Sequence, residues 1–250
     1  MSVNVIAFHF PDLPQVGCAF QLRQDPVPDV PASGGNISFT VHGDTPENVL
    51  TARRGLAARL HIEHWAELRQ VHGDGLLFDP APVAVDAQPA AEGDGMATDR
   101  SDLPLCIKTA DCQPILLAHA DGRHIAALHV GWRGNRCGFP QSAVRRFCER
   151  YRLSPRDILA VRGPSLGPAR AEFIHFDSEW GEDFRPWFHP GTRTMDLWGL
   201  TRHQLMEAGL LPGNIYGVDI CTASNPQLCF SHRHHPASGR QASFIWRHEG

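Results

Sequence analysis

The sequence has no long hydrophobic run, no excess of basic residues and no closely spaced pair of cysteines. None of its apolar runs approaches the roughly 20 residues that a membrane-spanning helix needs, so we expect no membrane association. The formal net charge of −4 at pH 7 gives no general positive field for nucleic acid or anionic lipid. Residues 1–10 lack a basic segment followed by a cleavage signal, and we interpret them as a first strand.

The seven cysteines are scattered, and no two of them form a C-x-x-C pair. An odd, scattered set argues against both a secreted disulfide framework and a zinc ribbon. We therefore expect a reducing, cytoplasmic location. The sequence is unusual in its fifteen histidines, since imidazole serves in metal binding and in proton transfer near neutral pH.

Apolar periodicity and turn signals predict a mixed α/β or α+β fold. With 250 residues, 42% of them hydrophobic, the chain is long enough to bury a sizeable core. Helices are predicted over residues 45–60, 139–151 and 196–209. Strands are predicted over residues 103–107, 115–118, 124–129, 158–161, 215–220 and 243–246. Residues 80–95 are predicted to be a surface loop. We expect one domain over residues 1–250, with mixed β-sheets flanked by helices.

Three strand-like runs end at a side chain that can bind a metal. They carry His72 in Gln-Val-His-Gly, Cys112 in Thr-Ala-Asp-Cys-Gln-Pro and His129 in His-Val-Gly-Trp-Arg-Gly. Zinc prefers thiolate and imidazole, and three protein ligands leave a fourth position for water or substrate. Only the fold can bring together residues this far apart. On the residues alone, the alternatives of a loop histidine and a small core cysteine stay open.

Three further features bear on binding. Residues 131–138 are glycine-rich and precede a predicted helix, so with Arg133 they predict a small phosphate site, or a tight turn whose arginine pairs with a carboxylate. The run of residues 231–235 is rich in histidine and is interpreted as a solvated turn or a second metal site, with Arg233 as an anion contact. Asp111 either orients a ligand or handles a proton; the alternative is a carboxylate at a strand end that caps nearby amides.

These segments resemble the laccase-domain family, which was described as multicopper polyphenol oxidases and later as purine nucleoside phosphorylases. The resemblance runs from about residue 36 to residue 246. Besides the three segments above, it rests on Gly163-Pro-Ser-Leu-Gly-Pro, Cys221-Thr and Gly239-Arg-Gln-Ala-Ser-Phe-Ile-Trp. The pairing of Thr-Ala-Asp-Cys with His-x-Gly-Trp-Arg-Gly is its most specific part.

The resemblance implies mixed sheets flanked by helices and a zinc ion held by His72, Cys112 and His129. It implies nucleoside and phosphate as partners, with phosphorolysis of adenosine, inosine and methylthioadenosine, deamination of adenosine, and a link to peptidoglycan editing. The site residues expected from it and from the features above are Cys112, His129 and Asp111 for catalysis, and Arg133, Asn36, Arg233 and Arg240 for substrate or phosphate.

The chain departs from the family at two places that bear on specificity. Ser165 stands where many members have cysteine, so a thiol at that position cannot be essential. His232 and His234 flank Arg233 where the family more often has tyrosine and arginine.

Other functions remain open at this point. Cys112 and His129 could form a nucleophile–base pair of a hydrolase or deamidase acting on a cell-wall precursor or another small amide. Copper could replace zinc in a polyphenol oxidase, although His-x-His occurs here only at residues 232–234. The usual zinc deaminase signature is absent. A pure binding protein is a further alternative. We expect a monomer or a small homo-oligomer.

Overall fold

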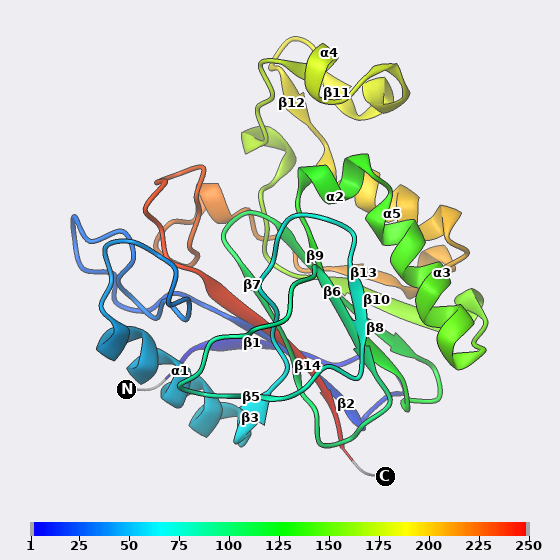
Figure 1. Ribbon diagram of the computed structural model, residues 1–250. Helices are drawn as coiled ribbons and strands as arrows, with labels where there is room; N and C mark the ends of the chain where they lie inside the picture. Colours follow the sequence, from blue (N-terminus) through cyan, green and yellow to red (C-terminus); the bar gives the residue numbers. More distant parts are fainter. Residues whose placement is uncertain (1–2, 249–250) are drawn as a thin grey trace.

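Two β-sheets packed face to face organise the chain in a computed structural model that describes residues 3–248 (Figure 1). The four-stranded sheet has the order β1 (Val5–Phe8), β2 (Val16–Gln21), β14 (Gln241–Arg247) and β7 (Leu105–Thr109). The six-stranded sheet has the order β13 (Ile215–Gly217), β10 (Ile158–Arg162), β8 (Gln113–His119), β9 (Ile125–Val130), β6 (Gly95–Thr98) and β4 (Leu76–Phe78). Neighbouring strands are antiparallel, except for the parallel pairs β10–β13 and β4–β6.

Strand β8 shows why the predicted strands have unbroken apolar runs. Its Leu116 and Ala118 enter the core between the two sheets, whereas Ile115 and Leu117 pack on the other face, against helices. Side chains alternate between the two faces of a strand, so a strand covered on both faces needs apolar residues at every position. The predictions over residues 115–118 and 158–161 are confirmed for this reason.

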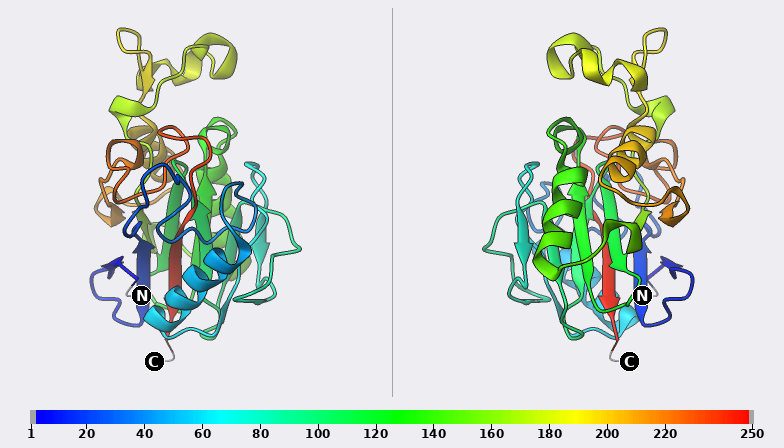
Figure 2. Two further views of the ribbon diagram at one scale, coloured as in Figure 1. Left: turned by 90° about the vertical axis from the view of Figure 1, so that its left-hand side faces the viewer. Right: turned by 90° about the vertical axis from the view of Figure 1, so that its right-hand side faces the viewer.

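The three predicted helices are confirmed. Helix α1 (Pro46–Leu60) begins at Thr45, whose hydroxyl accepts from Asn48 N, and it covers the outer face of the four-stranded sheet. Helices α3 (Phe139–Tyr151) and α5 (Leu197–Glu207) cover the outer face of the six-stranded sheet. The molecule thus has four layers, with a helix layer on each side of two sheets (Figure 2). No helix within residues 3–248 has the length and apolar character needed to cross a membrane.

Some elements differ from the prediction. Strand β2 was not predicted, because its small residues Gly17 and Ala19 give no clear alternation, yet it pairs with both β1 and β14. The turn predicted within residues 131–138 contains a short helix, α2 (Trp132–Arg136). The predicted loop over residues 80–95 is interrupted by β5 (Val83–Ala84), which pairs with β3 (His64–Trp65). Residues 1 and 2 of the predicted first strand lie outside the described residues.

One segment projects from the end of the sheets at which β9 terminates (Figures 1 and 2). We call residues 168–196 the projecting segment. It contains α4 (Phe176–Glu179), the hairpin of β11 (Phe188–His189) and β12 (Thr194–Met195), and 3₁₀ turns at Pro168–Arg170 and Glu182–Trp187. Phe173, Phe176 and Trp180 give it a small apolar core of its own. Further 3₁₀ turns lie at Pro155–Asp157, Pro212–Asn214 and Thr222–Ser224.

A buried ion pair joins α1 to the sheet beneath it. The Arg53 guanidinium is fully buried and donates to Glu67 at 3.0 Å and to the carbonyls of Ile37 and Val85. Glu67 also accepts from Trp65 Nε1 at 2.7 Å and from Lys108 Nζ at 2.8 Å. This contact was not predicted from the sequence, since an arginine on a helix is normally solvated.

We predict that Arg53→Ala lowers the free energy of unfolding by about 3–5 kcal/mol, because it leaves the Glu67 carboxylate buried without its main partner. Arg54→Ala is the matched control, since Arg54 is the next residue of the same helix and is exposed; its effect should stay within about 0.5 kcal/mol. Urea unfolding of both variants measures the difference. Equal losses in the two variants would contradict the role assigned to the pair.

Candidate functional site

Three of the predicted site residues converge at one end of the two sheets. His72 lies in the loop between β3 and β4, Cys112 in the connection from β7 to β8, and His129 near the end of β9. One potential ligand atom of each lies within 4.8 Å of those of the other two. The rings of His72 and His129 meet edge to face, with centroids 4.8 Å apart. The site therefore forms where the edge strand of one sheet meets the centre of the other.

The buried carboxylate of Asp94 fixes this arrangement. One oxygen, Oδ1, lies 2.8 Å from His129 Nδ1 and accepts from His72 N at 2.9 Å. The other, Oδ2, accepts from Gly73 N at 2.7 Å and from Val71 N at 3.3 Å. Because His129 Nδ1 is engaged by Asp94, its Nε2 is left to face the other two side chains. Asp94 was missed from the sequence, where Gly-Asp-Gly is typical of an ordinary turn.

The Cys112 thiol and the His129 imidazole favour each other's charged forms. Burial by itself raises the pKa of the Cys112 thiol, but the charges and hydrogen bonds of His129 and His72 outweigh it and lower that pKa below its ordinary value. Burial lowers the pKa of His129, and the opposing effects of Cys112 and Asp94 are larger, so that pKa is raised. Among the cysteines of the described chain whose pKa is shifted, Cys112 is the one whose pKa is lowered, and the pKa of each of the others is raised. A lowered pKa means that the thiolate of Cys112 is stabilised.

The space between the three side chains suits a metal ion. A Cβ atom added to Gly131 would lie 2.9 Å from Cys112 Sγ and 3.2 Å from His72 Cδ2, so a residue other than glycine would press on the ligand set. Two imidazoles and a thiolate are a donor set of the kind that binds zinc and copper. The residues present therefore fit a transition metal, with a position open to a further ligand.

A cavity of about 580 Å³ opens over these residues. Thr109 and Gln113 line it, and Thr109 Oγ1 and Gln113 Oε1 are buried oxygens without a hydrogen-bond partner among the described residues. Such atoms are ones that a bound molecule or water can satisfy. The rings of Trp132 and Phe173 lie 5.9 Å apart and form an aromatic wall of the cavity, to which the projecting segment contributes Phe173.

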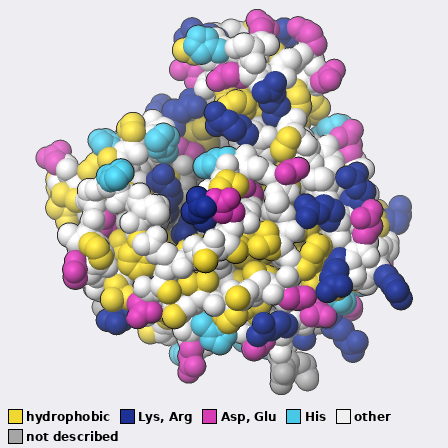
Figure 3. Space-filling model, viewed as in Figure 1, with side chains coloured by type: hydrophobic (Ala, Val, Ile, Leu, Met, Phe, Trp, Pro, Cys, Tyr) yellow, Lys and Arg dark blue, Asp and Glu magenta, His cyan; other side chains and the backbone are white. Residues whose placement is uncertain are grey.

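The cavity carries more positive charge than its carboxylates balance. Lys108 pairs with Glu67, and Arg69 pairs with Glu92. The remaining cationic side chains on its wall, which form no ion pair with any carboxylate of residues 3–248, are Arg133, Arg233 and Arg240. In Figure 3, basic and histidine side chains gather just below the projecting segment.

The three unpaired arginines differ in how they are held. Arg133 is exposed and lies over the ring of Trp132, with 4.3 Å from its Cζ to the ring centroid. Arg233 donates to the carbonyls of Arg170 and Glu172 in the projecting segment. Arg240 donates to the carbonyls of Ser238 and Gly239, and burial lowers its pKa against the raising effects of Cys112 and Asp111.

The side chain of Asp111 is occupied by hydrogen bonds from one segment of the chain. Its Oδ1 accepts from Thr222 Oγ1 and Ser231 Oγ, each at 2.6 Å, and its Oδ2 accepts from Arg233 N at 2.6 Å. Asp111 also lies on the cavity wall. Its contacts match the amide-capping alternative, since they fix the segment that carries Arg233.

One expected residue, Asn36, lies outside the cavity wall, and so does Ser165. Asn36 is buried behind this wall; its Oδ1 accepts from Arg240 N, and its Nδ2 donates to Ser38 O and Asp44 Oδ2. These bonds use both ends of the Asn36 amide. In this structure Asn36 therefore supports Arg240, whereas the expected role was a contact with substrate. Ser165 is fully buried and accepts from Trp198 Nε1 at 2.9 Å.

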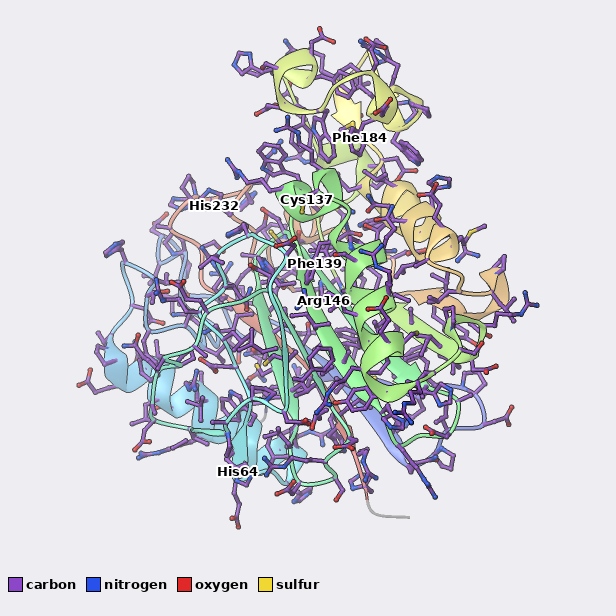
Figure 4. The ribbon with its side chains drawn as sticks, turned by 45° about the vertical axis from the view of Figure 1, so that its right-hand side comes forward. His64, Cys137, Phe139, Arg146, Phe184 and His232 are labelled. Carbon is purple, nitrogen blue, oxygen red and sulfur yellow. The ribbon has the colours of Figure 1, made fainter. Side chains whose placement is uncertain are left out.

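The histidine-rich run forms the expected turn. His232 lies on the cavity wall, and its Nδ1 lies 3.1 Å from Pro236 O. Among the described residues, His232 and His234 belong to no three-ligand cluster. Figure 4 places His232 and Cys137 at the end of the strands that faces the segment bearing Phe184, with His64 at the opposite end.

Beneath the site, four amide and hydroxyl side chains form a buried network. Gln113 donates to Thr201 at 2.8 Å and to Asn135 at 3.2 Å. Asn135 donates to Thr201 at 2.7 Å and to Gln204 at 2.8 Å. The network joins the residue after Cys112 to α2 and α5, and so sets the position of the helix that carries Trp132 and Arg133.

Part of the backbone at residues 131–138, where an anion site was expected, is engaged within α2. The amides of Asn135 and Cys137 donate within α2, to the carbonyls of Gly131 and Arg133. These two amides are therefore not free to bind an anion, whereas the first amides of α2, those of residues 132–134, lie at the helix N-terminus and have no partner within the helix.

We predict that Asp94→Asn weakens binding of a transition metal by about 10- to 100-fold, because it removes the charge that orients His129. Asp74→Asn is the control, since Asp74 lies in the loop that carries His72 but is exposed. Competition with a chelator measures both affinities. An unchanged affinity in Asp94→Asn would show that the carboxylate does not support a metal site.

Comparison with known proteins gives a family that matches this geometry. The family model described as "Multi-copper polyphenol oxidoreductase laccase" matches residues 17–248. A purine nucleoside phosphorylase of Xylella fastidiosa (strain Temecula1) is 37% identical over 224 residues, covering 85% of this chain and 83% of that protein. The purine nucleoside phosphorylase YfiH of Escherichia coli (strain K12) is 32% identical over 216 residues, covering 82% and 83% of the two chains.

A solved structure gives the same fold. YlmD from Geobacillus stearothermophilus superposes with a TM-score of 0.81 at 26% identity, covering 96% of this chain and 94% of that chain. The chain therefore belongs to the multi-copper polyphenol oxidoreductase laccase family, whose relatives in Xylella and Escherichia are named purine nucleoside phosphorylases.

Proposed function

We propose that this protein is a zinc-dependent purine nucleoside phosphorylase that acts on adenosine, inosine or methylthioadenosine, with adenosine deamination as a second activity. The observation that carries the proposal is the group of three arginines without carboxylate partners beside His72, Cys112 and His129. A phosphate dianion supplies the charge that this group lacks, and guanidinium matches its oxygens in geometry.

The cavity also suits the rest of a nucleoside. Trp132 and Phe173 offer apolar ring faces against which a purine can stack. The free oxygens of Thr109 and Gln113 are acceptors for the hydroxyl or amino groups of a substrate. In phosphorolysis, a phosphate oxygen bonds to C1′ of the ribose, the bond from C1′ to the purine nitrogen breaks, and the base leaves with that electron pair.

In this proposal His72, Cys112 and His129 hold zinc, which when bound supplies a Lewis acid able to polarise a substrate oxygen. Arg133 holds phosphate, because it has neither a carboxylate nor a hydrogen-bond partner within the described chain. Arg233 and Arg240 add positive charge to the same wall, and Asp111 positions the segment that bears Arg233. We further propose a cytoplasmic location, with nucleoside and phosphate as partners.

We predict that the protein converts inosine or adenosine plus phosphate to free base and ribose 1-phosphate. Arg133→Ala should lower kcat/KM for phosphorolysis by about 10- to 100-fold, the effect of removing one charged hydrogen-bonding group. It should lower deamination of adenosine less, since water rather than an anion is then the second substrate. Product analysis with and without phosphate measures both reactions.

Arg136→Ala is the matched control for Arg133→Ala, because Arg136 is an exposed arginine of the same helix and lies off the cavity wall. Its activity should match that of the unaltered protein. Base release that is indifferent to phosphate, or no turnover of any nucleoside by the zinc-loaded protein, would refute the phosphorylase.

A second candidate, a hydrolase or deamidase with Cys112 as nucleophile and His129 as base, is favoured by the lowered pKa of Cys112 and the raised pKa of His129. A copper-dependent polyphenol oxidase would use the same ligand set with another ion. Elemental analysis distinguishes zinc from copper, and the reactivity of the thiol distinguishes a ligand from a nucleophile.

We predict that iodoacetamide labels Cys112 slowly in the zinc-loaded protein and rapidly after a chelator is added, since a metal-bound thiolate is shielded. Cys137, which is exposed, is an internal control whose labelling should not change with the chelator. Mass spectrometry of the labelled peptides gives both rates. Rapid labelling of Cys112 with zinc in place, together with loss of activity, would favour the nucleophile.

A further inference from the structure

A second group of metal-binding side chains lies at the far end of the β8–β9 hairpin. His119 is the last residue of β8, and His124 directly precedes β9. His119 N donates to His124 O at 3.0 Å, so the two histidines close the hairpin and lie across from each other. Asp121, in the loop between them, extends its carboxylate toward both rings.

The separations within this group are those of ligands around one ion. Asp121 Oδ1 lies 3.0 Å from His119 Nδ1, and Asp121 Oδ2 lies 3.3 Å from His124 Nδ1. One ligand atom from each residue lies within 4.8 Å of the other two. Ligands bound to zinc at about 2.0–2.1 Å in a tetrahedron lie about 3.3 Å from one another. To bind an ion, the three ligand atoms must draw together from separations of up to 4.8 Å, and His119 Nδ1 can be a ligand once it releases the hydrogen bond that it accepts from Asp121 N at 3.3 Å.

An unsatisfied atom points to an ion rather than to ion pairs alone. His124 Nδ1 is buried and has no hydrogen-bond partner of acceptable geometry in the described chain, although the Asp121 carboxylate is close. The ring of His124 is fixed by Tyr151, with centroids 4.7 Å apart. Asp121 is fixed as well, because its Oδ1 accepts from Arg123 N at 2.8 Å. An unpartnered imidazole nitrogen on a ring packed against a neighbouring aromatic side chain is suited to binding a metal.

We propose that His119, Asp121 and His124 form a second divalent-metal site, selective for a borderline ion such as zinc. Two imidazoles and one carboxylate lack the thiolate of the first site and leave positions for water. The two sites lie at opposite ends of β8, about 20 Å apart at the usual rise of 3.3 Å per residue. Neither site shares a residue with the other, and the second does not depend on the proposed phosphorylase activity.

The test is the number of zinc ions bound per chain after equilibrium dialysis at micromolar free zinc. We expect two ions for the unaltered protein, one for His124→Ala and one for Cys112→Ala. His203→Ala should keep two, because His203 also faces a carboxylate, Glu207 at 3.3 Å, but joins no third ligand in the described chain. Two ions in His124→Ala, or none in Cys112→Ala, would overturn the proposal.

Asp121→Asn is the second variant, since an amide oxygen can still accept from Arg123 N while the anionic ligand is lost. It keeps the test decisive if His124→Ala does not fold, and it should bind one ion. Cobalt(II) added to Cys112→Ala should give ligand-field absorption without a thiolate charge-transfer band, and that absorption should disappear in Cys112→Ala/Asp121→Asn. Absorption that persists there would place the second ion elsewhere and refute the site.

Discussion

The buried charge of Asp94 is the constraint on which the candidate metal centre depends. A carboxylate shielded from water is costly unless hydrogen bonds compensate it, and here they come from two distant parts of the chain, the loop at residues 71–73 and His129 on β9. Neither part can move without leaving the charge uncompensated. Because the desolvation cost enforces this geometry, the ligand side chains are held in place by the protein itself.

The same principle of charge balance separates the arginine and lysine side chains that pair with a carboxylate from those on the cavity wall that do not. Arg53 and Lys108 both pair with Glu67, so their charges hold α1 and β7 in place. Arg133, Arg233 and Arg240 have no such partner in the described chain. A surface that leaves several guanidinium groups without carboxylates, next to an aromatic wall, is complementary to a molecule that is anionic at one end and planar at the other.

The parts of the structure that depend on local patterns were accessible from the sequence. The three long helices follow from apolar periodicity and from caps such as Thr45 and Asp196. The convergence of His72, Cys112 and His129 followed from their places at strand ends together with the family resemblance.

Long-range contacts were not accessible in this way. Asp94 becomes distinctive only when β6 pairs with β9 and brings it beside His129. Asn36 lies in the part of the chain that resembles the family, but its side chain does not line the cavity. Its amide is hydrogen-bonded to neighbouring backbone and to Asp44. Arg53 lies on the apolar face of a helix, where only the position of Glu67, 14 residues further on, explains a charge.

The amide and hydroxyl network under α2 limits which substitutions related chains can accept at its four positions. Gln113, Asn135, Thr201 and Gln204 lie on three different elements and hydrogen-bond to one another out of contact with solvent. Replacing one member by an apolar residue leaves its partners unsatisfied, at about 1–3 kcal/mol for each such group. Replacing all of them by a well-packed apolar set removes that penalty. These four positions should therefore covary among related chains, with mixed intermediates depleted by selection against unstable proteins.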